Sequence, residues 1–366
     1  MNIHEYYIKE CIKLAKKGIG YVSPNPLVGS VIVKNNKIIG KGFHKVFGQS
    51  HAEVNAIIDA KKNGYNLNGT SLYVNLEPCN HFGKTPPCTE AIIKDKIRNV
   101  IIGMNDPNKN VSGNGIKKLK ESGINVTSGI LEKECEELNK FFVKYITKST
   151  PYITLKIAQS IDAKIALNNF KSKWITNDES RIFVHKLRSR YDSVLIGKNT
   201  AIYDNPSLTV RGTKGRNPFR FVIDRKGSLP SDLNLYTDEN FLNTYTFISS
   251  KYSDSKKISD KEINKIFLKE INHNIPLKEI LKSIFKLEIA SILVEGGGNL
   301  FSRFINEDLF DDVYFIVAPK IIGKGISYSG DFELNRLSES KFLNLDKVIT
   351  SNGDIILYYK NIKKGK

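Results

Sequence analysis

The chain has 366 residues, of which 40% are hydrophobic and 26% are charged, and its formal net charge is +18. This length and composition exclude a disordered or fibrous protein and predict a globular protein of two domains. No run approaches the roughly 18 apolar residues of a membrane span, and the N-terminus lacks the basic and apolar regions of a secretory signal. We therefore expect a cytoplasmic protein without a membrane partner.

The positive charge raises the question of nucleic acid, because lysine-rich surfaces attract phosphates. Apart from short pairs such as Lys16-Lys17, the basic residues form no stripe with interleaved aromatics. We interpret the excess as solvated lysine faces and expect no nucleic-acid partner. A phosphorylated small substrate would benefit from the same field.

Helices and strands alternate along the first half. In chain order we expect a helix over 5–17, strands over 28–33 and 37–42 joined by a turn at Asn35-Asn36, a helix from 51, a strand over 71–76, a helix from Cys88, a strand over 100–104 and a helical stretch over 130–148. The order predicts an α/β sandwich. It places His51 and Glu53 in the first turn of a helix and Cys79 just past the end of a strand.

Two short motifs in this half predict a catalytic zinc site. The first is His51-Ala52-Glu53, and the second begins at Pro78-Cys79 and ends at Cys88. One imidazole and two thiolates suit tetrahedral zinc, and three protein ligands leave the fourth position for a water, whose pKa zinc lowers to about 7. Glu53 is the expected proton carrier, as in the H-x-E and P-C-x-x-C pattern of nucleobase deaminases. Here eight residues, not two, separate the cysteines.

Two other interpretations of these residues exist. His81 or His44 as a fourth ligand would close the zinc site and make it structural. The cysteines could instead form a disulfide, although four cysteines in 366 residues without a secretory signal favour a reducing compartment.

Ser149-Thr150-Pro151 interrupts the helical stretch, so we place the domain boundary there and expect domains at 1–149 and 150–366. The second half is again predicted to be α/β, with strands over 153–158, 191–197, 219–224, 244–248, 291–294 and 313–318 and helices over 178–189 and 299–306. Residues 250–283 carry no informative motif.

Three glycines, Gly296, Gly297 and Gly298, follow an apolar strand and precede a helix. Backbone N–H groups in such a turn can approach a phosphate closely, but a triple glycine is equally typical of a tight turn. The pattern is not the dinucleotide fingerprint G-x-G-x-x-G. The single tryptophan, Trp174, is either a core residue or a face for cofactor stacking.

Taken together, the two halves resemble the bifunctional riboflavin-biosynthesis deaminase/reductase family. The motifs that carry the resemblance are Ser23–Gly29, Glu77–Cys88 with its eight-residue cysteine spacing, Asp106–Asn108, Ser172–Thr176, Asp204–Arg211, Val294–Gly298 and Ala318–Lys320. The resemblance covers nearly the whole chain, except for residues 226–290 and the C-terminal tail.

The resemblance implies a fold and two successive reactions. The expected fold is an N-terminal cytidine-deaminase-like α/β/α sandwich followed by a C-terminal α/β domain similar to dihydrofolate reductase. The first reaction is zinc-dependent hydrolytic deamination of 2,5-diamino-6-ribosylamino-4(3H)-pyrimidinone 5′-phosphate. The second is reduction of the ribosyl group to ribityl by NADPH, which gives 5-amino-6-ribitylaminouracil 5′-phosphate. The family also implies a homo-oligomer that assembles through the reductase domain.

The same resemblance implies site residues beyond the zinc ligands. In the deaminase half, the implied substrate contacts are Asn25, His44, His81, Lys84, Asp106 and Asn108. In the reductase half, the implied NADPH contacts are Ala158, Trp174, Thr200, Asp204, Gly297, Gly298, Asn299, Leu300, Phe301, Ser302 and Arg303, and the implied substrate contacts are Lys156, Ser172, Arg188, Leu208, Arg211 and Glu295. Lys84, Arg188 and Arg211 suit a phosphate. His44 could instead be a satisfied loop histidine.

Two competing functions remain. The positive charge would suit a nucleic-acid base deaminase with an accessory binding domain, in which the second half binds RNA instead of NADPH. A structural zinc would suit a binding module without catalysis.

Overall fold

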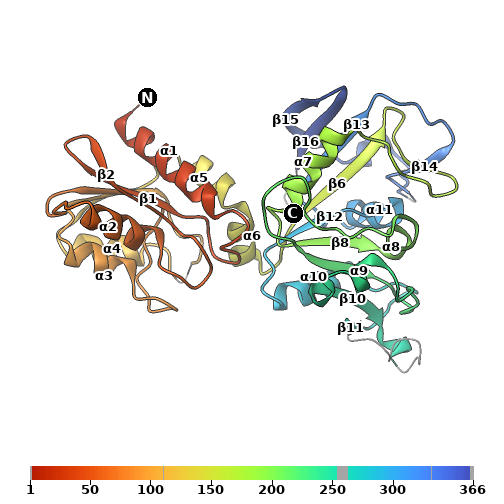
Figure 1. Cartoon of the computed structure of the whole chain (residues 1–366), viewed down its shortest axis with the longest axis horizontal. Helices are drawn as coiled ribbons and strands as arrows, with labels where there is room; N and C mark the ends of the chain where they lie inside the picture. The colour runs from red at the N-terminus through yellow and green to blue at the C-terminus, as the bar shows by residue number, and fades with distance from the viewer. Residues whose placement is uncertain (1, 110, 254–262, 331, 363–366) are drawn as a thin grey trace. The chain divides into compact units, whose positions relative to one another are not determined.

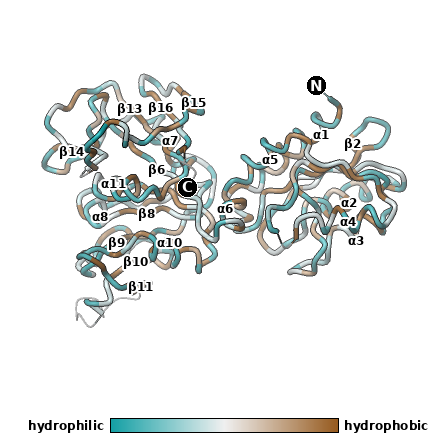
Figure 2. The backbone as a smooth tube through the Cα atoms, turned by 180° about the vertical axis from the view of Figure 1, so that it is seen from behind, coloured by the Kyte–Doolittle hydropathy of each residue, from teal (hydrophilic) through white to brown (hydrophobic). Residues whose placement is uncertain are grey.

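The computed structural model describes residues 2–109, 111–253, 263–330 and 332–362. The chain divides into two compact units, Met1–Thr150 and Pro151–Lys366 (Figure 1). Both are α/β, so the predicted fold class is confirmed. Hydrophobic segments lie in strands of the sheets, such as β8 (Ser193–Gly197) and β9 (Phe219–Ile223) (Figure 2). Within the described ranges, every helix is too short or too polar to cross a bilayer.

The first unit is built on a five-stranded sheet in the order β2-β1-β3-β4-β5. Its strands are β1 (Gly29–Lys34), β2 (Lys37–Phe43), β3 (Ser71–Leu76), β4 (Asn99–Met104) and β5 (Asn125–Thr127). Strand β1 runs antiparallel to β2 and β3, and β3, β4 and β5 are mutually parallel. Asn35 and Asn36 have φ angles of 51° and 58°. Both central residues of a type I′ hairpin turn need positive φ, so the predicted turn is confirmed.

Helices cover both faces of this sheet (Figure 1). They are α1 (Ile3–Ala15), continued by η1 (Lys16–Gly18), then α2 (Ala52–Lys62), α3 (Cys88–Lys94), α4 (Asn114–Glu121), α5 (Glu132–Leu138) and α6 (Lys140–Lys148). A Cβ at Gly29 would lie 2.1 Å from the Cys11 carbonyl oxygen of α1, and one at Gly42 would lie 2.2 Å from the Ala52 carbonyl oxygen of α2. Glycine at these positions therefore lets α1 and α2 lie close to the sheet. At Gly42 the close approach is to Ala52, the first residue of α2.

Two details of the first unit differ from the prediction. His51 is the N-cap of α2, with extended backbone, and only Glu53 lies in the first turn. The helical stretch over 130–148 is two helices that meet at Asn139. The Asn139 side chain accepts from the Leu27 N–H at 2.7 Å and donates to the Leu27 carbonyl at 3.1 Å. This contact between Asn139 and Leu27 lies where the two helices meet. The helical periodicity of the sequence gives no sign of it.

The second unit contains a nine-stranded sheet in the order β11-β10-β9-β8-β12-β6-β13-β16-β15. Besides β8 and β9, its strands are β6 (Tyr152–Ser160), β10 (Thr244–Ser249), β11 (Asn264–Leu268), β12 (Ser291–Val294), β13 (Asp312–Ala318), β15 (Leu343–Ser351) and β16 (Asp354–Asn361). The strands from β11 to β13 are parallel, and β16 and β15 are added antiparallel at one edge.

The remaining elements of this unit surround the sheet. They are the two-stranded ribbon β7 (Lys164–Leu167) and β14 (Gly325–Ser327), the helices α7 (Asp178–Arg188), α8 (Lys198–Asp204), α9 (Asn234–Thr237), α10 (Leu277–Lys286) and α11 (Gly298–Asn306), and the short turns η2 (Phe241–Asn243), η3 (Ser250–Tyr252) and η5 (Leu337–Glu339). The strands and helices predicted for this half are all present. Residues 250–283, for which no structure was predicted, include β11 and part of α10, and 254–262 lie outside the described residues.

Candidate active sites

Three side chains in the first unit form a potential metal centre. The Nδ1 atom of His51 and the Sγ atoms of Cys79 and Cys88 lie within 4.8 Å of one another. His51 Nδ1 is 3.4 Å from Cys79 Sγ and 3.3 Å from Cys88 Sγ. Ligands of tetrahedral zinc, with bonds of about 2.1 and 2.3 Å, stand about 3.6 Å apart, so the donor set fits this ion. Among the described residues, neither His81 nor His44 joins this cluster.

The electrostatics of the cluster favour a thiolate. Cys88 is the first residue of α3, and its N–H donates to Cys79 Sγ at 3.4 Å. Hydrogen bonds from the Cys88 thiol and from His51 lower the pKa of Cys79 to about 4, although burial opposes them. The pKa of Cys88 is raised, first because it shares its proton with Cys79 and then by burial. A metal would displace that remaining proton, since thiolates are the ligating form.

Glu53, the expected proton carrier, lies beside this cluster and hydrogen-bonds to Cys88. Its side chain is buried, and its Oε2 atom has no hydrogen-bond partner in the part of the chain described. Burial raises the pKa of Glu53 to about 7, with the charge of His51 opposing that shift. The Glu53 carboxyl does hydrogen-bond to the Cys88 side chain, but buried polar atoms are usually all paired, and Oε2 is not. An unpaired oxygen on a carboxyl that contacts Cys88 suits a group that exchanges protons with a bound molecule.

Asn25 and His44 lie on loops beside the zinc cluster. The His44 ring is buried, 5.4 Å from the His51 ring between centroids, with its Nδ1 3.3 Å from the Ser50 carbonyl oxygen. Its Nε2 lies 3.4 Å from Asn25 Nδ2. Burial lowers the pKa of His44. The structure thus brings Asn25, His44 and His51 together. The contacts of His44 are compatible with both of its expected roles, a substrate contact and a loop histidine.

Glu77 is a buried residue that sequence reasoning did not select. Its Oε2 accepts from the N–H groups of Asp106 at 3.1 Å and Gly113 at 3.0 Å, and its Oε1 accepts from Gly115 at 3.0 Å. Asp106 Oδ1 in turn accepts from the Asn108 N–H at 2.8 Å. Glu77 therefore holds the loop that carries two predicted substrate contacts. In the sequence, only the position of Glu77 directly before Pro78 pointed to a role at the site.

His81 and Lys84 lie on the segment between the two cysteines and are exposed. Lys84 Nζ lies 4.0 Å from the centre of the Phe47 ring. Phe47 belongs to the loop that leads to His51, and its N–H donates to the Tyr21 carbonyl. A cation–π contact therefore connects the loop before His51 to the segment between the two cysteines. It leaves the Lys84 ammonium accessible to an anion.

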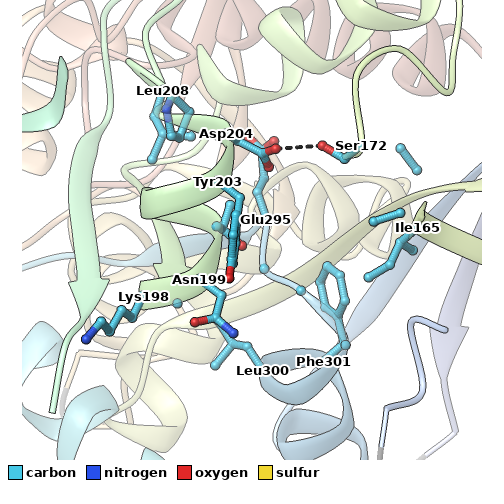
Figure 3. Close-up of a pocket in the computed structure, with 18 of the residues that line it drawn as sticks. Ile165, Ser172, Lys198, Asn199, Tyr203, Asp204, Leu208, Glu295, Leu300 and Phe301 are labelled. Carbon is cyan, nitrogen blue, oxygen red and sulfur yellow. Dashed lines mark hydrogen bonds between the residues drawn. The ribbon is translucent and has the colours of Figure 1, made fainter. Parts of the chain in front are cut away.

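The second unit contains a cavity of about 1350 Å³ at the carboxyl ends of its parallel strands (Figure 3). It is lined by every residue expected to bind NADPH except Ser302, and by all six residues expected to bind substrate in this half. Ser302 is buried, and its hydroxyl donates to the Asn299 carbonyl at 3.0 Å. On α11 it faces Gly330, because a Cβ at Gly330 would lie 3.2 Å from Ser302 Oγ.

Glu295 forms the most strongly charged contact of this cavity. Arg188 binds its carboxylate through Nε at 2.6 Å and Nη2 at 3.0 Å, and Lys156 Nζ lies 3.0 Å from Oε2. Burial alone would raise the pKa of Glu295, but the charges of Arg188 and Lys156 outweigh it and hold the pKa well below its usual range. Arg188 also donates to the Thr209 carbonyl at 3.2 Å. Its charge is thus largely balanced within the protein, whereas Arg211 is exposed.

The three glycines before α11 have different surroundings. A Cβ at Gly298 would lie 2.4 Å from the Ser327 carbonyl oxygen, and one at Gly296 would lie 2.8 Å from Leu300. A Cβ at Gly297 would meet only Thr200 Oγ1, at 3.8 Å. Packing therefore requires glycine at Gly296 and Gly298, while Gly297 faces open space in the cavity at a helix N-terminus. The motif therefore combines a tight turn, at Gly296 and Gly298, with open space that a phosphate could occupy, at Gly297.

Opposite this turn, Ser172 Oγ donates to Asp204 Oδ1 at 2.6 Å across the cavity (Figure 3). Trp174 is 64% exposed, so it is not a core residue, and the Arg181 guanidinium lies 4.2 Å from the centre of its ring. The Tyr203 ring stacks on Phe170 at 4.3 Å between centroids. Flat aromatic faces at the cavity suit a planar heterocyclic ligand.

Comparisons with known proteins identify the family of each half. Residues 1–104 match the cytidine and deoxycytidylate deaminase zinc-binding region, and residues 151–356 match the RibD C-terminal domain. The riboflavin biosynthesis protein RibD of Aquifex aeolicus is 41% identical over 360 residues, which cover 98% of this chain and 99% of that protein. The chain belongs to the RibD family. The RibD protein of Escherichia coli is 34% identical and covers 87% of this chain, with 88% of its own length matched.

Solved RibD structures have the same fold. A deaminase/reductase from Thermotoga maritima superposes with a TM-score of 0.89 at 39% identity, covering 98% of this chain and 99% of that one. Acinetobacter baumannii RibD gives 0.89 at 33% identity, covering 99% of each chain. The chain is therefore a bifunctional deaminase and reductase of riboflavin biosynthesis. An accessory nucleic-acid-binding domain does not describe the second half, which is a RibD reductase domain.

Proposed function

We propose that the first unit deaminates 2,5-diamino-6-ribosylamino-4(3H)-pyrimidinone 5′-phosphate and that the second unit then reduces the ribosyl group of the product with NADPH. The observation that carries this proposal is the meeting of His51, Cys79 and Cys88 beside the orphaned Oε2 of Glu53, in a chain that belongs to the RibD family. The products are ammonia and, after reduction, 5-amino-6-ribitylaminouracil 5′-phosphate.

In the deaminase, His51, Cys79 and Cys88 would hold zinc, which when bound would supply a water of lowered pKa. Glu53 would take one proton of the attacking water at Oε2 and pass it to the ring nitrogen. It would then take the second proton, from the hydroxyl now on the ring carbon, and pass it to the departing amine, so that ammonia leaves as a neutral molecule. Burial raises the pKa of Glu53, and a raised pKa suits a carboxyl that both takes and gives up a proton near neutral pH.

Substrate contacts in this half come from three loops. Asn25 and His44 stand beside the His51 ring, Asp106 and Asn108 lie on the loop held by Glu77, and His81 and Lys84 lie between the cysteines. We assign the 5′-phosphate to Lys84, whose ammonium is exposed and oriented by Phe47. Exposed cations on a loop are suited to a phosphate because they need not be desolvated in its absence.

In the reductase, the protein positions NADPH against C1′ of the sugar. We place the cofactor phosphates at Gly297 and the N-terminus of α11, where no side chain fills the space. Trp174, Thr200 and Asp204 line the same cavity as the other proposed cofactor contacts. Lys198, Arg225 and Lys226 also line the cavity. Arg225 is paired with Glu270 and Lys198 lies 3.9 Å from Asp224, so we assign the additional phosphate of NADPH to Lys226 and Lys198 in preference to Arg225.

The substrate of the reductase is placed on the side of Ser172, Leu208 and Glu295. Because the Arg188 guanidinium already binds the Glu295 carboxylate, whereas Arg211 is exposed, we assign the substrate phosphate to Arg211 in preference to Arg188. Lys156 and Arg188 then orient the Glu295 carboxylate toward sugar hydroxyls, which a carboxylate can accept from.

We also propose a homo-oligomer formed through the reductase domain. The edge strand β15 of its sheet exposes Leu345, Val348 and Ile349 by 48%, 56% and 39%. An exposed apolar edge strand is an aggregation risk unless it is covered. Sedimentation of the full chain and of a Val348→Lys variant tests this contact; a wild-type monomer contradicts it.

The whole proposal is tested by supplying the diaminopyrimidine phosphate with NADPH and following ammonia and NADPH separately. Ammonia should appear without NADPH, and NADPH should be consumed only after deamination. Consumption of NADPH without prior ammonia release contradicts the order, and ammonia release from RNA but not from the pyrimidine contradicts the substrate.

A further inference from the structure

One wall of the reductase cavity is a segment without regular structure, residues 205–211, between α8 and β9. Asn205, Ser207, Leu208 and Arg211 line the cavity. Asn205 has a φ of 39° and Leu208 a φ of 53°, in the left-handed region that side chains disfavour, leucine more than asparagine. Such conformations persist only where surrounding contacts over-determine them, and they cluster at ligand sites.

A contact from Arg220 of β9 holds the backbone at Leu208. The Arg220 side chain is 1% exposed, and its Nη1 donates at 2.8 Å to the carbonyl of Ser207, the residue directly before Leu208. A buried guanidinium needs a charged partner. Asp238 provides it by accepting from Nη1 at 2.6 Å and from Nη2 at 2.9 Å.

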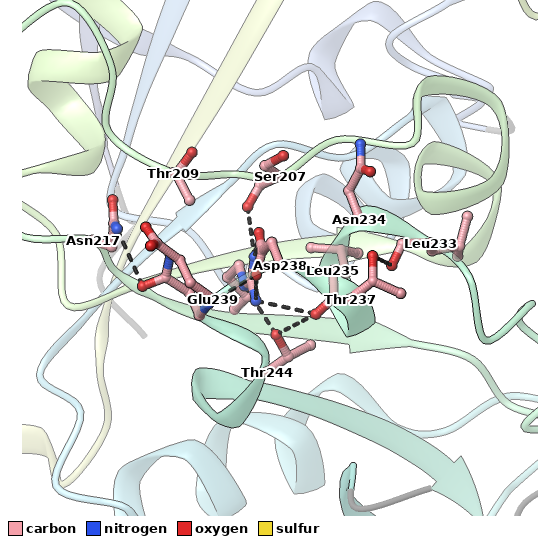
Figure 4. A network of polar contacts seen from close by, with 12 residues as sticks. Ser207, Thr209, Asn217, Leu233, Asn234, Leu235, Thr237, Asp238, Glu239 and Thr244 are labelled. Carbon is pink, nitrogen blue, oxygen red and sulfur yellow. Dashed lines mark hydrogen bonds and ion pairs between the residues drawn. The ribbon is translucent and has the colours of Figure 1, made fainter.

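The remaining donors of Arg220 are also used. Nε donates to Thr244 Oγ1 at 2.9 Å, and Nη2 donates to the Leu235 carbonyl at 3.1 Å. Figure 4 shows Ser207, Asp238 and Thr244 meeting in this network. Arginine has five N–H donors, and five contacts engage them. Arg220 therefore has no donor left for a ligand, and it acts on the cavity only through Ser207.

Neighbouring residues hold the same wall from the same side. The Asn234 N–H and Nδ2 donate to Asn205 Oδ1 and to the Asn205 carbonyl, each at 2.8 Å. Asn217 Oδ1 accepts from the Val210 N–H at 2.8 Å. The wall is therefore supported by Asn217, by Arg220 of β9 and by residues 234–244, which carry no sequence motif.

We propose that Arg220, fixed by Asp238, is a positioning residue of the reductase that sets the Ser207–Leu208 segment against the substrate. The inference rests on the proposed reductase function of this cavity. It predicts that loosening the network weakens substrate binding, because Leu208 and Arg211 move with the segment, while NADPH bound at Gly297 is held by α11, away from the network.

The test is Arg220→Lys, which keeps the charge for Asp238 but has three donors instead of five and no planar fork. The matched control is Arg216→Lys. Arg216 pairs with the buried Asp192, which precedes β8 at the amino ends of the strands, and neither residue lines the cavity. Both variants are assayed for reductase kinetics, for deamination in the other unit, and for hydrogen exchange of residues 205–211.

For Arg220→Lys we expect KM for the deaminated pyrimidine to rise about tenfold, with a smaller change in kcat, an unchanged Kd for NADPH and unchanged deamination. Hydrogen exchange in 205–211 should accelerate. The control should show none of these. Equal effects of the two variants, or a rise in Kd for NADPH that matches the rise in KM, would mean a general loss of stability and overturn the proposal.

The exchange measurement needs no substrate, so it separates this proposal from the function on which it rests. A wild-type chain that does not reduce the sugar contradicts the reductase proposal, whereas unchanged exchange in 205–211 contradicts the positioning role by itself. Should Arg220→Lys not fold, Asp238→Asn weakens the same pair while retaining one acceptor oxygen. It should accelerate exchange in 205–211, and unchanged exchange would overturn the proposal.

Discussion

In the first unit, three donor atoms within 4.8 Å of one another define the reactive centre, whereas the cavity of the second unit spans about 1350 Å³ and is lined by residues from Lys156 to Gly330. The zinc centre depends on the chemical identity of a few atoms. The reductase cavity depends on backbone shape, on glycines without side chains and on charges balanced inside the protein. The two halves should therefore respond differently to mutation: abruptly at single atoms in the first, and gradually in the second.

The largest effect is expected for Glu53→Gln. The amide cannot carry the proton, so ammonia release should fall about 10²- to 10⁴-fold. Zinc content should persist, because the three ligands are untouched, and reduction of an already deaminated substrate should proceed at the wild-type rate. Ammonia assays with metal analysis check this. Undiminished deamination would contradict the role of Glu53.

Glu295→Gln should be the most destabilising change at the cavity. It leaves Arg188 and Lys156 without their counter-charge, and breaking a buried ion pair from one side costs about 3 kcal/mol. Thermal unfolding of the second unit should shift to lower temperature, while deamination by the first is retained. If the variant melts like wild type, the ion pair is not structurally important.

The same pair gives a pH dependence of stability. The pKa of Glu295 is depressed in the folded state, so its contribution is present above the unfolded value of about 4.3 and is lost as pH falls toward the folded pKa. The stability difference between wild type and Glu295→Gln should thus be constant near neutral pH and shrink below about pH 4. Denaturant unfolding at several pH values measures it, and a difference that grows with acid would contradict the assignment.

Gly297→Ala and Gly298→Ala form a matched pair at the glycine turn. At Gly298 a Cβ meets the Ser327 carbonyl at 2.4 Å, so alanine should destabilise the unit by about 1–3 kcal/mol. At Gly297 alanine should fold normally but raise Kd for NADPH about tenfold by filling the space assigned to a phosphate. Fluorescence titration with NADPH separates the two. Normal binding by Gly297→Ala would place the phosphates elsewhere.

A smaller effect is expected for Lys84→Gln. Losing one exposed cation should raise KM for the diaminopyrimidine phosphate about fivefold at low salt, and less at high salt, where screening already weakens the contact. Lys37→Gln is the control, because Lys37 is the exposed first residue of β2, and it should change neither KM nor the salt dependence of KM. A rise in KM that is independent of salt would argue against a phosphate contact at Lys84.

Several site residues could be predicted from the sequence because their chemistry is local. The H-x-E motif, the two cysteines and their eight-residue separation predicted a cluster that the structure assembles. The roles of Asn139, Glu77 and Arg220 could not be predicted, because each depends on a backbone group far along the chain: Leu27, Gly113 and Ser207. A polar side chain shows its partner only when both are in place.

The sequence by itself indicated the candidate metal ligands and proton carrier, the α/β class of both halves with many of their strands and helices, and the family, whereas elements such as α4, α8, β15 and β16 were not predicted. Tertiary structure decided which charges are free. The sequence gives no reason to distinguish Arg188 from Arg211, yet Arg188 is paired with Glu295, whereas Arg211 is exposed. It also decided which glycine of three faces the cavity. Ligand chemistry belongs to individual side chains, whereas available charge and open space are properties of the packed neighbours.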